Sequence, residues 1–218
     1  MTNRNARTLA PKLLAPLAAA SALLAGTAAQ AEVFGIMNGR TAGAPEQEVS
    51  VELALQLDDD LRYIGVRGNY LLQPDMTVFA NISQLSFDDN SDADGFEIGG
   101  GAFLHLGEQR VAPSIDLALK PAIGIGQVSS GDFDGTIYNL SGEVLASSAE
   151  AISSAGLNWY ANLGLAIFGS SGDFDDDTDV EPILGGGITL PAGPGTLYAG
   201  IDFIDNIQFG AGFRYGLR

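Results

Sequence analysis

The sequence contains few groups that could carry out catalysis. It has one histidine, His105, and no cysteine, which excludes thiolate nucleophiles, disulfides and cysteine metal sites. The motifs G-x-S-x-G and H-E-x-x-H and a phosphate-binding glycine loop are missing, and no serine is obviously paired with His105. A hydrogen-bonded histidine inside the fold is therefore favoured over a general base. We expect no enzymatic activity and no cofactor.

Two acidic stretches have a spacing that could bind a divalent cation. The first places Asn90, Asp92 and Asp94 at the first, third and fifth positions of a calcium loop. Its twelfth position is Gly101, where an EF-hand requires a bidentate glutamate. The second stretch has alternating acids and no closing ligand: Asp173, Asp175, Asp177 and Asp179. The two interpretations are a solvated acidic loop and weak Ca²⁺ or Mg²⁺ binding, of millimolar affinity at best.

A third group of charged residues lies opposite apolar residues in alternating segments. Successive side chains of a strand point to opposite faces, so in a closed barrel these residues would share the lumen. They are Glu52, Arg67, Glu97, Asp116, Lys120, Asp202 and Arg214. Confined together, such charges should pair and hydrogen-bond. This predicts either a plug of ion pairs or a polar path for small solutes, and the plug is favoured because side chains can fill a small barrel.

The segment 207–217, IQFGAGFRYGL, shows the alternation most clearly. One face carries Ile207, Phe209, Ala211, Phe213, Tyr215 and Leu217, and the other carries Gln208, Gly210, Gly212, Arg214 and Gly216. A wholly apolar, aromatic-rich face opposite a small or charged face is typical of a barrel strand that faces lipid.

Nine earlier segments can be interpreted as strands in the same way. They are 49–57, 61–72, 77–87, 96–106, 115–125, 136–146, 157–167, 181–190 and 196–203. The period is weakest in 136–146, the register of 77–87 stays open, and 147–156 could be a loop or a short helix. The sequence predicts an all-β fold: a closed antiparallel up-and-down transmembrane barrel of about ten strands, or eight without the doubtful segment.

The first 31 residues are predicted to be a cleaved signal peptide. Arg4, Arg7 and Lys12 form a basic start, residues 13–24 are apolar, and Ala29-Gln30-Ala31 is a small-x-small cleavage site. The apolar run is shorter than the roughly 20 residues of a membrane-spanning helix. Residues 32–218 would form a single domain with a short N-terminal lead-in.

The charge of the mature chain excludes one class of partner. Removal of residues 1–31 leaves seven basic residues against 27 acidic ones, a net charge of −20. So acidic a chain is not suited to nucleic acid, which is bound through cationic contacts to phosphate. The acids concentrate in alternate connections, such as 58–60, 88–95 and 173–181, whereas the other connections carry little net charge. The sequence therefore predicts acidic extracellular loops at one end of the barrel.

These features together resemble the small outer-membrane β-barrel proteins of Gram-negative bacteria, of the opacity and outer-membrane-protein-A transmembrane-domain type. The spacing of Gln208, Gly210, Phe213 and Tyr215 resembles the terminal recognition strand of that class, although the chain continues to Arg218. The resemblance covers about residues 47–218. It implies a location in the cell outer membrane, contact with its lipid and lipopolysaccharide, and insertion by the barrel assembly machinery.

Three functions remain open. The first is a structural or surface-interaction barrel with a salt-bridged lumen. The second is a narrow, porin-like passive diffusion channel. The third is a soluble, secreted, acidic β-sandwich that binds a partner.

Overall fold

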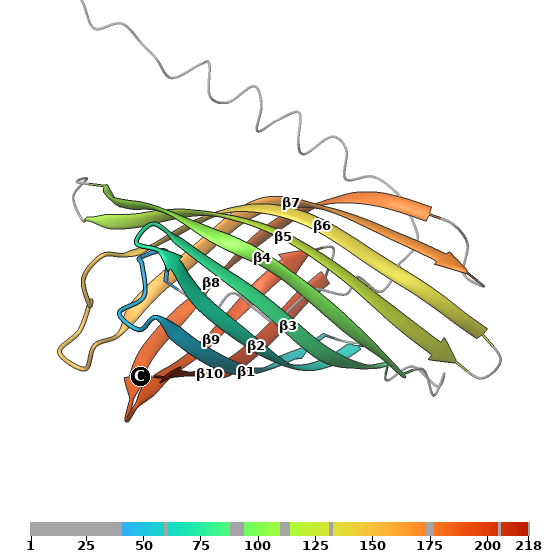
Figure 1. Cartoon of the computed structure of the whole chain (residues 1–218), viewed down its shortest axis with the longest axis horizontal. Coiled ribbons are helices and arrows are strands. Elements are labelled where there is room, and N and C mark those ends of the chain that lie inside the picture. Colours follow the sequence, from blue (N-terminus) through green and yellow to red (C-terminus); the bar gives the residue numbers. More distant parts are fainter. Residues whose placement is uncertain are drawn as a thin grey trace, which may run out of the picture. The chain divides into compact units, whose positions relative to one another are not determined.

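The structure, a computed structural model, describes residues 41–58, 61–87, 94–109, 114–130, 133–172, 177–204 and 206–217. It shows a closed antiparallel barrel in which each strand pairs with its neighbours in the sequence and β1 pairs with β10 (Figure 1). The strands are β1 (Val49–Leu57), β2 (Leu61–Gln73), β3 (Met76–Phe87), β4 (Asp94–Gln109), β5 (Ile115–Ser130), β6 (Phe133–Ser148), β7 (Asn158–Gly172), β8 (Asp177–Ala192), β9 (Gly195–Ile204) and β10 (Asn206–Leu217). The prediction of ten strands is confirmed, and the eight-strand and sandwich alternatives are wrong.

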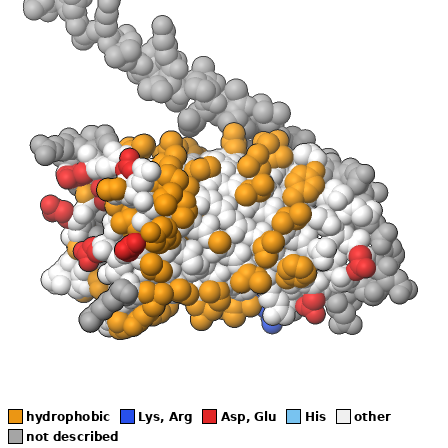
Figure 2. All heavy atoms as spheres, viewed as in Figure 1, with side chains coloured by type: hydrophobic (Ala, Val, Ile, Leu, Met, Phe, Trp, Pro, Cys, Tyr) orange, Lys and Arg blue, Asp and Glu red, His pale blue; other side chains and the backbone are white. Residues whose placement is uncertain are grey.

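The alternation of side chains explains why the sheet closes. On β1 the burial alternates residue by residue: Leu53 is 55% exposed, whereas Glu52 before it is fully buried. All ten strands expose large apolar side chains outward, and the inner face carries most of the buried polar groups. Apolar side chains form patches along the flank in view, and acidic side chains lie toward its two ends (Figure 2). This is the reverse of a soluble protein, whose apolar residues point into the core.

Several strands are longer than the sequence predicts. β4, β5, β6 and β8 have 16 residues each, and β4 begins at Asp94 and β8 at Asp177, inside the stretches expected to be loops. The reason is continued pairing: β5 and β6 stay in register as far as Ser130 opposite Phe133. Backbone pairing extends these hairpins past the point where the apolar alternation stops.

The doubtful segment 136–146 lies within β6, which pairs along its length with β5 and β7. The serine- and alanine-rich stretch after it forms a turn instead of a helix. There Ile152 N donates to Leu157 O at 2.8 Å, and Leu157 N donates to Ser153 Oγ at 3.2 Å. Within the described residues, no helix is long and apolar enough to cross a membrane.

The barrel has two distinct ends. At the terminal end β1 begins and β10 ends, and β2–β3, β4–β5, β6–β7 and β8–β9 are connected there. The far end carries the other five connections. The terminal end carries more negative charge than the sequence of its connections predicts. Glu46 and Glu48, which precede β1, lie at this end together with Asp75.

Candidate functional site in the barrel lumen

The strand register brings three predicted charges into one row of the inner wall. Glu52 on β1 lies directly opposite Arg214 on β10 and Arg67 on β2. Arg67 in turn lies opposite Asn81 on β3. Residues opposite each other on one face of a sheet are near enough to interact, so this register makes Glu52 a shared acceptor.

Glu52 is the centre of the first ionic cluster. Its carboxylate accepts from Arg214 Nε at 3.0 Å and from Asn69 Nδ2 at 3.0 Å, and Tyr198 Oη lies 3.5 Å away. Arg67 Nη1 is 4.0 Å from the same carboxylate, and the Arg67 guanidinium stacks 4.6 Å from the ring centroid of Phe79. A buried carboxylate needs such charge-assisted partners, because desolvation otherwise outweighs its Coulomb attraction.

Glu143 is the centre of the second cluster. Lys120 Nζ donates to Glu143 Oε1 at 2.7 Å, and Asn162 Nδ2 donates to Oε2 at 2.9 Å. Asp202 lies beside Asn162 on the same wall. Glu143 was not among the seven charges picked out from the sequence. The sequence pattern could have identified it. Leu140 and Val144 point outward, so the alternation along the strand places Glu143 on the inner face.

Glu97 differs from Glu52 and Glu143, the carboxylates at the centres of the two clusters. It accepts from Tyr63 Oη and from Asn139 Nδ2, each at 3.3 Å, and makes no salt bridge within 4.0 Å in the described part of the chain. Beside it is a cavity of about 30 Å³, with Arg67, Asn81, Lys120, Glu143 and other residues in its wall. That volume has room for about two water molecules, and the buried Asn81 Nδ2 has no acceptor among the described residues.

Apolar layers lie on both sides of these charges. Along β5 the inward residues run Ala118, Lys120, Val128 from the terminal end to the far end, and along β6 they run Leu145, Glu143, Ile137. The terminal-side layer consists of Phe79, Phe103, Ala118 and Leu145, with Ala42 packed against them. The far-side layer consists of Ala54, Tyr63, Leu85, Val128 and Tyr198, together with Ala166, Phe168, Ile183 and Ile204. The charges therefore form an ionic layer that lies between apolar clusters on its terminal side and on its far side.

Inward glycines make room for the large side chains of the lumen. Tyr160 on β7 lies across Gly187 on β8 and Gly200 on β9, because a Cβ added at either glycine would meet the Tyr160 ring or hydroxyl. Tyr198 lies across Gly212 on β10 in the same way. These glycines are needed for close approach inside the lumen, where a side chain from a neighbouring strand takes the space of a Cβ.

His105 is buried in the lumen near the terminal end. Its Nδ1 lies 2.8 Å from Ala42 O, and its Nε2 lies 3.0 Å from Thr77 Oγ1. A carbonyl oxygen only accepts, so Nδ1 carries the hydrogen in this contact. The ring stacks on Phe103, with centroids 6.3 Å apart. Both ring nitrogens thus have partners that position the ring.

The structure places the remaining predicted residues apart from these clusters. Asp116 points inward but lies at the terminal end, opposite Glu108 and partly exposed. Asn90, Asp92, Asp173 and Asp175 lie outside the described residues. Asp94, Asp177 and Asp179 belong to strands β4 and β8. Within the described ranges, no group of three or more His, Asp or Glu residues could hold a metal ion.

The terminal strand closes the barrel and contributes to the lumen. Gln208 is buried, hydrogen-bonds to Gln56, and donates from Nε2 to Asp58 Oδ2 at 3.4 Å. Gly210 also faces inward, whereas Phe213 and Tyr215 lie on the outer face. β10 pairs with β1 over nine residue pairs.

Comparisons with solved structures find other barrels. A bacterial polysaccharide outer membrane secretin is 12% identical with a TM-score of 0.46, over 78% of this chain and 70% of that one. The KdgM porin is 9% identical with a TM-score of 0.37, over 78% and 99%. The translocator domain of the autotransporter NalP from Neisseria meningitidis is 11% identical with a TM-score of 0.35, over 79% and 90%. No protein-family model and no curated protein matches the sequence. The fold assignment rests on the closed pairing of the ten strands.

Proposed function

We propose that this chain is an integral β-barrel protein of the outer membrane with a closed lumen and a structural or surface-interaction role. The outer face supports a membrane location. On β10 the outward residues from Ile207 to Leu217 are all apolar, which is roughly 33 Å of strand at about 3.3 Å per residue. With a tilt of about 40° this gives a band roughly 25 Å tall, the height of the apolar band of outer-membrane barrels.

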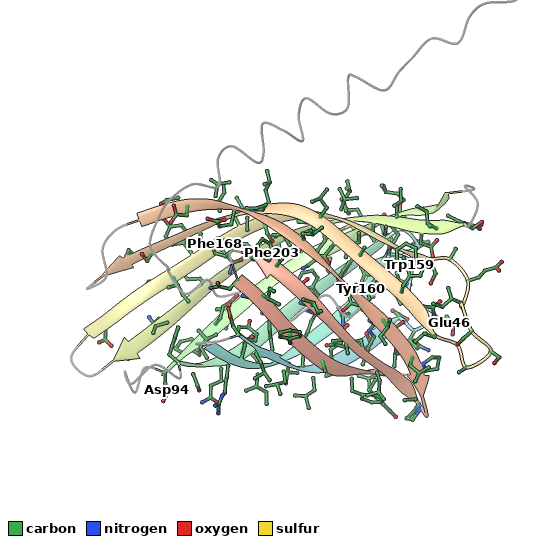
Figure 3. The ribbon with its side chains drawn as sticks, turned by 180° about the vertical axis from the view of Figure 1, so that it is seen from behind. Glu46, Asp94, Trp159, Tyr160, Phe168 and Phe203 are labelled. Carbon is green, nitrogen blue, oxygen red and sulfur yellow. The ribbon has the colours of Figure 1, made fainter. Side chains whose placement is uncertain are left out.

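The ends of the outer face support the same location. Among the described residues the charged side chains on this face lie near strand ends, as Arg62, Asp94 and Asp134 do. Trp159 lies nearer the end with Glu46, and Phe203 nearer the end with Asp94 (Figure 3). Aromatic residues at both levels and charges beyond them are what the two membrane interfaces favour.

The observation that carries the closed-lumen proposal is the stacking of the three layers. A solute would have to pass the terminal-side layer, the ionic layer and the far-side layer in series. The mid-lumen cavity beside Glu97 has room for about two waters. A diffusion channel instead needs a continuous aqueous path, which wider barrels provide.

Two measurements test this proposal. Cell fractionation should recover the protein with the outer membrane, and the folded barrel should show heat-modifiable gel mobility. In planar bilayers the reconstituted protein should produce no conductance steps under conditions in which an open porin, added as a positive control, conducts. Recovery in the soluble periplasmic fraction would remove the membrane assignment, and steady channels from the wild-type protein would establish the diffusion channel instead.

The partners we propose follow from this location. The terminal end would face the periplasm, from which the barrel assembly machinery would engage β10, and the acidic connections of the far end would face the cell exterior. Ca²⁺ or Mg²⁺ could bridge those acids to lipopolysaccharide phosphates. Titration calorimetry of the folded barrel with CaCl₂ tests the bridge, and an absence of heat at millimolar calcium would remove it.

A further inference from the structure

Residues 41–48, which we call the strap, cross the mouth of the barrel at its terminal end. The strap leads into β1, yet Ala42 N donates to Ser147 Oγ on β6 at 2.8 Å. In the ten-strand barrel β6 is five strands away from β1 in either direction, so it forms the opposite wall. The strap therefore spans the width of the mouth.

The opposite wall holds Ala42 at three points. Ser147 Oγ accepts from its backbone nitrogen, His105 Nδ1 donates to its backbone oxygen at 2.8 Å, and its methyl group packs on the terminal-side layer. Ala42 is only 1% exposed. These groups hold a backbone N–H, a backbone C=O and a small side chain, which is the chemistry of peptide binding.

Neighbouring residues restrict the bound segment further. A Cβ at Gly43 would lie 2.6 Å from Asp116 Oδ2, so a glycine fits best beside that carboxylate. The strap sequence at this point is Thr41-Ala42-Gly43-Ala44-Pro45, with small residues where the pocket is tight. The pocket thus matches its occupant in side-chain size as well as in backbone hydrogen bonds.

Few hydrogen bonds attach the strap to the barrel wall. Over residues 41–47 the described structure has two hydrogen bonds, both to Ala42, and no pairing with a strand. Ala44, Glu46 and Gln47 are exposed. Regular pairing resumes at Glu48, whose oxygen accepts from Leu71 N at 2.7 Å.

We propose that Phe103, His105, Leu145 and Ser147 form a peptide-binding pocket at the terminal mouth, and that the strap occupies it as a removable plug. The ligand class is a short peptide segment with an alanine-sized side chain, and the strap of this same chain supplies it. The inference depends on the fold alone, so it stands whether or not the barrel conducts or resides in the outer membrane.

The absence of cysteine from the chain allows a direct test. Ala42→Cys and the matched exposed variant Glu46→Cys are reacted, as folded full-length barrels in detergent, with a polar maleimide. The thiol at position 42 should react at least 100-fold more slowly than the one at position 46. Equal rates would overturn the proposal, because the strap would then lie outside the pocket. Heat-modifiable mobility establishes that each variant is folded.

A second arm tests whether the plug can be removed. Adding Ser147→Ala to the Ala42→Cys variant should raise its labelling rate about tenfold, the equivalent of one hydrogen bond, while Ser147→Thr should restore protection. A synthetic peptide with the sequence of residues 38–48 should also speed labelling at position 42, and the same peptide with Leu in place of the alanine should not. If neither Ser147→Ala nor the peptide changes the rate, the strap is a fixed part of the wall and the removable plug is refuted.

Discussion

Glu52 is the acceptor shared by both arginines of the lumen. Glu52→Gln should lower the free energy of unfolding by about 3 kcal/mol, because it leaves Arg67 and Arg214 in a closed interior without the carboxylate they share. Urea unfolding followed by fluorescence of Trp159, the only tryptophan, measures the change. The control is Glu46→Gln at an exposed site, expected within about 0.5 kcal/mol of wild type. Equal effects of the two substitutions would show that the shared carboxylate contributes nothing beyond an exposed one.

Gly212 on β10 and Gly68 on β2 differ in the space around them, because Gly212 faces the lumen and Gly68 faces outward. A Cβ at Gly212 would meet the Tyr198 ring and the Leu53 carbonyl oxygen, whereas a Cβ at Gly68 meets nothing within 4 Å. Gly212→Ala should therefore destabilise the barrel by about 1–3 kcal/mol through overpacking. Gly68→Ala should be neutral or slightly stabilising, since alanine restricts the unfolded chain. The same urea titration compares them, and a loss at Gly68 as large as that at Gly212 would contradict the packing explanation.

At the residue scale, the alternation of side chains identifies which residues face the lumen but not which of them meet. Glu52 and Arg67 follow from the pattern, and their contact depends on the register of β1 against β2. The register depends on how neighbouring strands pair, and this pairing cannot be derived from a single sequence. The distinction between Glu143, paired with Lys120, and Glu97, held by neutral donors, depends on it in the same way.

At the scale of elements, β6 is the strand with the weakest sequence signal, and its outer face tests whether it spans the bilayer. Leu140 lies near the middle of β6 and Thr136 nearer its far end, and both side chains point outward. Leu140→Arg should cost about 2–4 kcal/mol in lipid bilayers, and Thr136→Arg about 0–1 kcal/mol, because the penalty falls toward the interface. Unfolding in phospholipid vesicles measures both. A Thr136→Arg penalty equal to that of Leu140→Arg would place the membrane boundary elsewhere.

The ten strands could be predicted because a period of two persists wherever lipid and lumen lie on opposite sides of the sheet. Two features could not. β4 and β8 extend to Asp94 and Asp177 through backbone pairing, which leaves no trace in apolar periodicity. The strap shows no alternation of apolar and polar residues. Its one buried residue, Ala42, is fixed by a hydrogen bond to Ser147 on the opposite wall, and the sequence pattern does not reveal that contact.

At the scale of the whole molecule, the lumen is organised like a protein core in which the polar part is central. The apolar clusters beside the ionic layer lower the local dielectric constant, which strengthens each ion pair and also raises its desolvation cost. The outer face would need no such arrangement in the proposed membrane location, because lipid would replace solvent there. Inside the barrel, ion pairs and hydrogen bonds satisfy the buried charges, and apolar clusters lie between these charges and the two ends.

If the three layers of the lumen block solutes one after another, the lumen should conduct only when all three are truncated. Tyr63→Ala, Arg67→Ala and Phe103→Ala each truncate one layer, and each single variant should stay as closed in planar bilayers as wild type, because the other two layers still block the path. The triple variant should conduct, since one continuous path would then join the two ends. Heat-modifiable mobility establishes folding before each recording. Conductance in any single variant would show that one layer alone forms the barrier, and a folded triple variant without conductance would place the barrier outside these three residues.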